Sequence, residues 1–231
     1  MGVVKELSIS LEIDQVLRRQ GMRPGSPGAS RFTDITRELL EMVRDEDLLT
    51  PQLVYEQHSL SYVDEGLVQL GETYLQGTTL ASTLRPAEAG IVAICTIGPA
   101  LEREVQRLFA EGEKTKGLLL DGLGSAAVDG VARESCHVLR EIASSAGSTA
   151  SSALSPGMPG FPLSEQERIF ELVDGAQIGV RLTPSGMMEP RKSVSLVVGF
   201  GPDMPTWTQG EVCARCPMRD TCDYKPRPDV A

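Results

Sequence analysis

The sequence predicts an α+β fold, in which an antiparallel sheet is flanked by helices. Alternating apolar residues indicate strands at residues 178–182 and 194–200, and residues 90–97 form a continuous β-rich run. Apolar residues at helical spacing indicate helices at residues 33–45 and 116–143. Because strands and helices do not alternate as regular βαβ units, we expect an antiparallel sheet.

The first part of the chain predicts one strand, two helices and then further strands. Residues 7–19 begin with alternating apolar residues and predict a strand leading into a short helix. Residues 21–30 have the composition of a loop, and a helix follows over residues 33–45. Its apolar face consists of Ile35, Leu39, Met42 and Val43. Residues 52–95 resemble strands broken by turns, and residues 90–97 predict a buried strand.

The centre of the chain predicts two consecutive helices. Pro99 suits the first position of a helix, and Gly112 can end it. The apolar stripe of this helix is Leu101, Val105, Leu108 and Phe109. The next helix, residues 116–143, has many small residues in its first half: Gly122, Gly124, Ser125, Ala126, Ala127 and Gly130. Glycine costs about 1 kcal/mol against alanine inside a helix, so something packs closely here. We favour a neighbouring helix or strand over a ligand or partner surface.

The last third predicts a connection, a helix and a hairpin. Residues 144–153 are rich in Ser, Ala and Gly and predict a flexible connection. Ser164 and Glu167 form a capping box, which predicts a helix that buries Ile169, Phe170 and Val173 and ends at Gly175. We expect the strands at residues 178–182 and 194–200 to pair antiparallel across the loop 184–192.

Charge and hydropathy exclude several classes of function. The 231 residues carry a formal net charge of −10, which argues against binding to nucleic acid or to an anionic membrane surface. The longest apolar runs are too short to span a bilayer, and no early segment resembles a signal peptide. We therefore expect a cytoplasmic protein.

Three parts of the sequence, in this order and spacing, resemble the reactivation domain of cobalamin-dependent methionine synthase and its stand-alone relatives. They are residues 96–102 with 120–132, residues 155–166 with 178–183, and residues 188–195. The resemblance covers residues 90–201 well and residues 1–89 loosely. We expect one activation-domain-like domain over residues 1–205 and a Cys-rich tail over residues 206–231.

The resemblance implies a role in corrinoid chemistry. In the family, this domain binds S-adenosylmethionine in a shallow groove and docks over the corrinoid of a partner. An electron and the methyl group of S-adenosylmethionine then restore methylcobalamin from inactive Co(II). We therefore expect an accessory protein of corrinoid-dependent methyl transfer, with a corrinoid protein or corrinoid methyltransferase as its partner. Two alternatives stay open: a corrinoid-binding module that has lost S-adenosylmethionine binding, and an iron–sulfur electron-transfer protein.

The resemblance also implies ligand-binding residues. Asp129 stands where the family has a helix glutamate beside the cationic ligand, although an i, i+4 pair with Arg133 explains it equally well. The family motif Arg-x-Ser-Pro-Gly-Tyr corresponds here to residues 153–158. Ser155, Pro156 and Gly157 match it, whereas Ala153 replaces the arginine and Met158 the tyrosine. Alanine cannot grip a carboxylate, although Arg181 or Arg191 could substitute.

The tail contains the most specific local motif. Cys213, Cys216 and Cys222 have the spacing of ligands for zinc or an iron–sulfur cluster. A fourth ligand could be Cys95, Cys136, His137, a second subunit or an exogenous group; free thiols in a mobile tail are the alternative. For His58 we expect a surface role, and for His137 a packed or half-exposed position.

Overall fold

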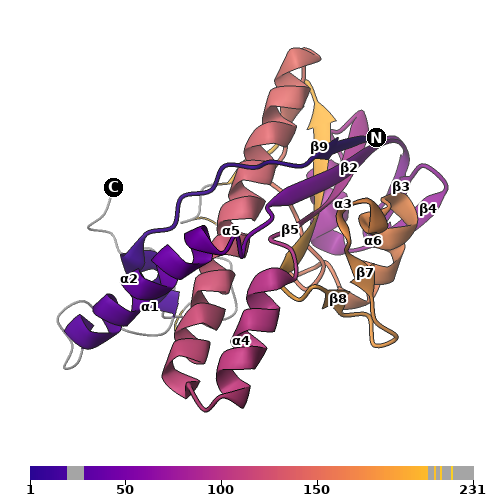
Figure 1. The fold of residues 1–231 in the computed structure, drawn as a ribbon. Coiled ribbons are helices and arrows are strands. Elements are labelled where there is room, and N and C mark those ends of the chain that lie inside the picture. The colour runs from indigo at the N-terminus through magenta and orange to yellow at the C-terminus, as the bar shows by residue number, and fades with distance from the viewer. Residues whose placement is uncertain (20–28, 208–210, 212–213, 215–219, 221–231) are drawn as a thin grey trace.

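The computed structural model describes residues 1–19, 29–207, 211, 214 and 220, and it centres on one antiparallel sheet (Figure 1). The order of strands is β4-β3-β2-β5-β9-β6, and β1 pairs with β2. The strands are β1 (Gly2–Val4), β2 (Gln52–Val63), β3 (Leu67–Leu70), β4 (Thr73–Gln76), β5 (Ala89–Thr96), β6 (Thr149–Ala150) and β9 (Ser193–Gly201). A second, small sheet pairs β7 (Arg181–Leu182) with β8 (Met188–Glu189).

Helices cover both faces of the large sheet. They are α1 (Ile13–Arg19), α2 (Ala29–Asp45), α3 (Thr78–Leu84), α4 (Ala100–Ala110), α5 (Lys114–Ser145) and α6 (Gln166–Leu172). Two 3₁₀ turns, η1 (Leu163–Glu165) and η2 (Gly175–Ile178), flank α6. Helices α1, α2, α4 and α5 lie on one side of the central strands, and α3 and α6 on the other (Figure 1). None of the helices described is long and apolar enough to cross a membrane.

The two faces of the sheet form two separate cores because successive strand residues point in opposite directions. Ile91, Leu123 and Leu196 belong to the core beneath α5, which we call the α5 core. Val92 and Val197 belong, with Ile169, to the core beneath α6, which we call the α6 core. Both central strands are therefore buried on both faces, which explains why residues 90–97 form a continuous apolar run.

The predicted fold class is confirmed, and so are most of the long elements. Helices over residues 33–45 and 116–143 correspond to α2 and α5. The buried strand predicted at residues 90–97 corresponds to β5, and the helix after Pro99 to α4. The close packing on α5 involves neighbouring elements. A Cβ atom at Gly124 would lie 2.7 Å from Leu101 of α4, and one at Gly130 would lie 3.6 Å from Ile9.

The N-terminal prediction is wrong in part. The segment before α1 is not a strand, although the predicted short helix is present as α1. Leu7 is buried and Ile9 packs over α5, so the alternation reflects a segment that lies along a helix. The predicted loop at residues 21–30 falls mostly on residues 20–28, which lie outside the described residues, and α2 begins at Ala29.

The predicted hairpin between residues 178–182 and 194–200 is also wrong. Ile178 lies in a 3₁₀ turn, and the short strand β7 pairs with β8. Strand β9 instead lies between β5 and β6, with its full length up to Phe200 paired to β5. The alternation of Val194, Leu196 and Val198 did not reveal that Val197, between them, is buried in the other core.

The flexible connection predicted at residues 144–153 instead contains the end of α5 and a segment, residues 149–151, that pairs with the edge of β9. Residues 149 and 150 form β6. The N–H of Ser151 donates to the carbonyl of Gly199 (2.9 Å), and the N–H of Gly199 donates to the Ser151 hydroxyl (2.9 Å). The chain after β9 returns to this segment, where the N–H of Trp207 donates to the Ser152 hydroxyl (2.7 Å). Backbone pairing thus overrides a composition typical of linkers.

The helix predicted from the capping box is present as α6, but its start differs. No side chain caps α6, which is preceded by the 3₁₀ turn η1. The Glu165 carboxylate instead accepts a hydrogen bond from the backbone N–H of Gln76 in β4 (2.9 Å). Helix α3, between β4 and β5, was not predicted.

Candidate functional site

The predicted ligand-binding residues Ser155, Pro156, Gly157 and Met158 form one tight turn. Met158 N–H donates to the Ser155 carbonyl (3.1 Å), and the Ser155 N–H donates to the Met158 sulfur (3.3 Å). Gly157 has a φ of +94°, a conformation that favours glycine. Met158, which replaces the family's tyrosine, is therefore folded back onto its own turn.

The turn is fixed to helix α3 by a close backbone approach. The Gly160 carbonyl accepts a hydrogen bond from the N–H of Thr79 (3.1 Å), and Phe161 is fully buried in the α6 core. A Cβ atom at Gly77 would lie 2.7 Å from the Gly160 carbonyl oxygen. Glycine is needed at position 77, because a side chain there would prevent the close approach of its backbone to that of Gly160.

The other predicted residues lie toward the opposite face of the sheet. Asp129 is half-buried on α5, one helical turn after Ser125. Ala153, which replaces the family's arginine, packs against the α5 core, whereas Leu154 and Met158 belong to the α6 core. Asp129 and the turn are therefore associated with different faces of the sheet. A single groove remains a prediction.

A polar network joins the loop before β9 to helices α4 and α5. The Lys192 ammonium group lies 2.9 Å from the Asp121 carboxylate and donates to the Ser125 hydroxyl (2.8 Å). The backbone N–H of Lys192 donates to the Glu102 carboxylate (2.7 Å). The Lys192 side chain is only 15% exposed, so its charge needs the nearby carboxylate. The peptide bond before Pro190 is cis, within the same loop.

Hydroxyl groups extend this network into the sheet. The buried Ser193 hydroxyl donates to the Thr96 hydroxyl (2.9 Å) or to the Pro190 carbonyl (2.7 Å), and Thr96 in turn accepts the N–H of Gly98 (3.1 Å). The segments 96–102, 120–132 and 188–195, which carry the family resemblance, therefore meet in one network. Glu102, Asp121 and Lys192 lie in these segments but were not predicted as site residues; their charge within segments that resemble the family was the available signal.

The two arginines that could replace the missing one have different positions. Arg181 of β7 is held by Glu189 of β8, with nitrogen–oxygen distances of 2.9 and 2.7 Å. Its guanidinium group is thus already paired with a carboxylate. Arg191 is exposed in the loop next to Lys192. It is therefore the better candidate to replace the family's arginine as the partner of a ligand carboxylate.

The predicted metal ligands Cys213, Cys216 and Cys222 lie outside the described residues, so their geometry stays a prediction. Among the described residues, no group of three or more His, Cys, Asp or Glu side chains could hold a metal ion. Cys95 and Cys136 are free thiols. Burial raises the pKa of Cys95 to about 12 and also raises the pKa of Cys136. A fully buried, neutral thiol such as Cys95 is a poor fourth ligand for the tail.

The histidines have structural positions. The ring nitrogen Nε2 of His58 lies 2.7 Å from the Leu172 carbonyl, so this part-buried residue joins β2 to the end of α6. The surface role expected for His58 is therefore wrong in part. His137 is 55% exposed and lies 3.3 Å from Glu141, as expected for a half-exposed residue on α5.

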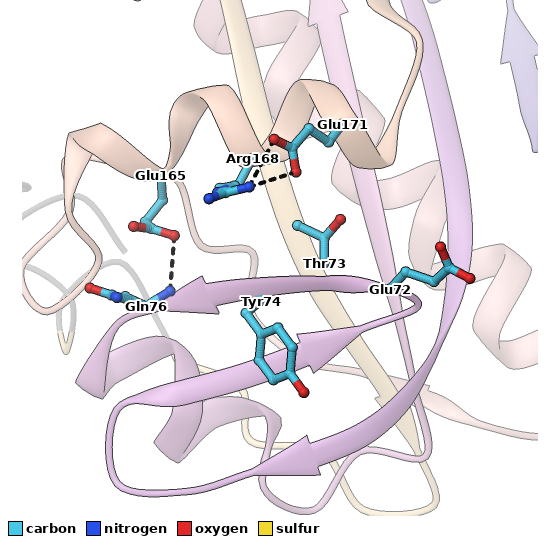
Figure 2. Close-up of a pocket in the computed structure, with 7 residues that line it drawn as sticks. All are labelled: Glu72, Thr73, Tyr74, Gln76, Glu165, Arg168 and Glu171. Carbon is cyan, nitrogen blue, oxygen red and sulfur yellow. Dashed lines mark hydrogen bonds and ion pairs between the residues drawn. The ribbon is translucent and has the colours of Figure 1, made fainter.

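A polar pocket of about 270 Å³ lies between strand β4 and helix α6 (Figure 2). It was not predicted. Glu165 and Arg168 lie above the strand, and the Arg168 guanidinium group donates to Glu171 (3.0 Å). We call it the edge slot; its lining residues are Glu72, Thr73, Tyr74, Gln76, Glu165, Arg168 and Glu171.

The antiparallel sheet, the long helix α5 and the loop network together define an α+β fold of the methionine synthase activation-domain type. A crystal structure of the MetH reactivation domain bound to AdoHcy has this fold. The likeness has a TM-score of 0.62 and 15% sequence identity, over 90% of this chain and 81% of that chain. No family model matches the sequence, and no curated protein matches it. The resemblance inferred from the three segments is thus confirmed at the level of the fold.

Proposed function

We propose that this protein is an accessory factor of corrinoid-dependent methyl transfer, which docks on a corrinoid protein or methyltransferase and supports reductive reactivation of cobalamin. One observation carries the proposal. The reactivation-domain fold extends over 90% of the chain, and residues 96–102, 120–132 and 188–195, which resemble the family, meet in the network around Lys192. The cobalamin belongs to the partner, and this chain supplies the docking surface.

The described residues fit only part of S-adenosylmethionine. A carboxylate such as Asp129 favours the cationic sulfonium or amino group. The ligand's carboxylate has no matching arginine at Ala153, and Arg181 is paired with Glu189. S-adenosylmethionine, when bound, supplies a methyl group; this chain would orient it through Asp129 and through the turn of Ser155, Pro156, Gly157 and Met158. We expect weak binding, with a dissociation constant above about 100 μM, or about −5.5 kcal/mol.

Titration calorimetry tests the ligand part of the proposal. The substitution Ala153→Arg should strengthen S-adenosylmethionine binding roughly tenfold, because a guanidinium group would meet the ligand's carboxylate. The matched control is Ala110→Arg, which adds the same charge at the exposed end of α4 and should leave affinity unchanged. Tight binding by the unmodified protein would show that another residue, such as Arg191, already fills this role.

Docking is tested separately, with a corrinoid protein in its Co(II) state as the titrant. Complex formation should shift the corrinoid absorption spectrum and raise the yield of methylcobalamin when reductant and S-adenosylmethionine are supplied. Absence of any complex would refute the accessory function, whatever the affinity for S-adenosylmethionine.

A second candidate function follows from the tail. The spacing of Cys213, Cys216 and Cys222 favours an iron–sulfur or zinc site, and Ala153 with Met158 favours loss of S-adenosylmethionine binding. The protein would then be an electron-transfer or corrinoid-binding module on the same fold. Metal analysis of anaerobically purified protein distinguishes this candidate from the first.

A further inference from the structure

Strand β4 ends the sheet, and its outer edge faces α6 across the edge slot (Figure 2). The N–H of Gln76 points away from β3, since it donates to the Glu165 carboxylate (2.9 Å). Along an edge strand, the backbone N–H and carbonyl groups of every second residue point away from the neighbouring strand. Tyr74 lies two residues before Gln76, so its N–H and carbonyl also point away from β3. Tyr74 therefore presents a donor and an acceptor to any segment that enters the slot, while its ring points away from α6 (Figure 2).

The size and polarity of the edge slot indicate what can occupy it. About 270 Å³ corresponds to roughly nine water molecules at about 30 Å³ each. Small-molecule sites are usually larger, at ~300–1,000 Å³, and mainly apolar. A polar slot that runs along a strand edge is better suited to a short stretch of extended polypeptide, whose backbone can pair with the strand.

The charges in the edge slot select the occupant. Glu72, Glu165 and Glu171 contribute three negative charges and Arg168 one positive charge, so the lining carries a net charge of −2. Arg168 is paired with Glu171, and Glu165 is 8% exposed. A lysine or arginine side chain that points from a docked strand toward α6 would complement these carboxylates. A second copy of this chain would bring two acidic edges together, which is unfavourable.

We propose that the edge slot binds an extended basic segment of a partner protein, which pairs with the backbone of Tyr74 and places a lysine or arginine side chain near Glu165. The proposal goes beyond the accessory function and does not depend on it. Strand addition supplies the backbone hydrogen bonds, and the acidic lining supplies selectivity for basic sequences.

The test uses a short extended peptide, capped at both ends, with a central lysine, and the same peptide with a central glutamate. Nuclear magnetic resonance of the full chain should show the Tyr74 amide signal shifting on addition of the lysine peptide, with little change for the glutamate peptide. The affinity should fall as salt is raised. Equal binding of both peptides, or a shift that bypasses Tyr74, would overturn the proposal.

Two pairs of variants distinguish the contribution of backbone hydrogen bonds to peptide binding from the contribution of charge. Tyr74→Pro removes the outward N–H and should weaken the lysine peptide about tenfold, whereas Tyr74→Ala keeps the N–H and should bind nearly as the unmodified protein. Glu165→Gln should weaken binding about fivefold. Glu167→Gln makes the same charge change on an exposed part of α6 outside the slot and should have no effect.

Each variant is checked by circular dichroism, and the Glu165 pair keeps the test decisive if Tyr74→Pro fails to fold. Unchanged affinity in both Tyr74→Pro and Glu165→Gln would refute the site. A dimer in sedimentation experiments that is lost in Tyr74→Pro would also refute it, because the edge would then pair with a second copy of this chain.

Discussion

Cys95 is a fully buried thiol on β5, and its environment makes the stability of the protein depend on pH. Burial raises the folded-state pKa to about 12, from a reference value of 9.0. Between these values the unfolded chain loses the proton while the folded chain keeps it. The stabilising contribution is thus fully present below about pH 9 and is lost as the pH rises toward 12.

We therefore predict that the advantage of the unmodified protein over Cys95→Ala shrinks above pH 9, by about 1.4 kcal/mol per pH unit. Urea unfolding under reducing conditions, at about pH 8 and about pH 10.5, measures this difference. The variant lacks the sulfur atom, and the cavity that this leaves costs the same at both pH values. A difference that does not change with pH would contradict the prediction.

Single residues of the candidate site were predicted unevenly from the sequence. The turn of Ser155, Pro156, Gly157 and Met158 was singled out because a contiguous family motif covers it, and its role in ligand binding stays a prediction. Lys192 was missed as a site residue because its partners, Glu102 and Asp121, are distant in sequence and meet only in the folded chain. Glu165 was given no role, because it lies between Ser164 and Glu167 of the predicted capping box and its partner Gln76 is distant in sequence.

At the scale of elements, the contact between the 155–161 loop and helix α3 depends on Gly160. Gly160 has a φ of +74°, and an added Cβ atom would overlap the Thr79 hydroxyl group. Gly147 has the same φ of +74°, but a Cβ there would meet nothing within 4 Å. Alanine at either position would therefore have the same backbone strain, but only alanine at position 160 would also clash with a neighbouring side chain.

We predict that Gly147→Ala costs about 1–2 kcal/mol from backbone strain alone. Gly160→Ala should cost more, by a further 1–3 kcal/mol or so, because the loop must move away from α3. Chemical denaturation of both variants measures the two costs. Equal losses would show that the loop relaxes freely and that its position on α3 is not fixed by this contact.

Long elements were predicted better than their pairing. Residues 116–143 have the apolar spacing of a helix, and residues 90–97 form a continuous apolar run. Each pattern lies within one segment, so it predicts that segment without knowledge of its neighbours. Strand β7 was predicted to pair with the strand at residues 194–200, but it pairs with the two-residue strand β8. An alternating pattern indicates which face of a strand is buried, but it does not indicate the partner strand. Residues 144–153 were taken as a linker because the pairing of residues 149 and 150 with β9 depends on backbone groups, which every sequence carries.

At the scale of the whole molecule, packing against the domain continues at least to Trp207, two residues beyond the predicted domain end at residue 205. Met204 is buried, and Trp207 packs against the α6 core. The division into residues 1–205 and a tail of residues 206–231 stays a prediction, with this adjustment to its boundary.

We predict that a chain ending after Trp207 unfolds at nearly the same temperature as the full chain but carries no iron or zinc. Its hydrogen bonds to Ser152 are kept, while Cys213, Cys216 and Cys222 are removed. Calorimetry and metal analysis of anaerobically purified protein measure the two properties. The matched control replaces the three cysteines with alanine in the full chain. A full chain without metal, or metal retained after truncation, would contradict the tail site.

The return of the chain from β9 to residue 152 has a practical consequence. The sequence contains a single tryptophan, Trp207, and its backbone N–H is held by the Ser152 hydroxyl. The indole packs against the α6 core, as Met158 of the predicted ligand-binding turn does, so it is a native fluorophore on that side of the sheet. A corrinoid, which absorbs where tryptophan emits, would quench this emission on docking, so that the association could be timed without attaching any dye.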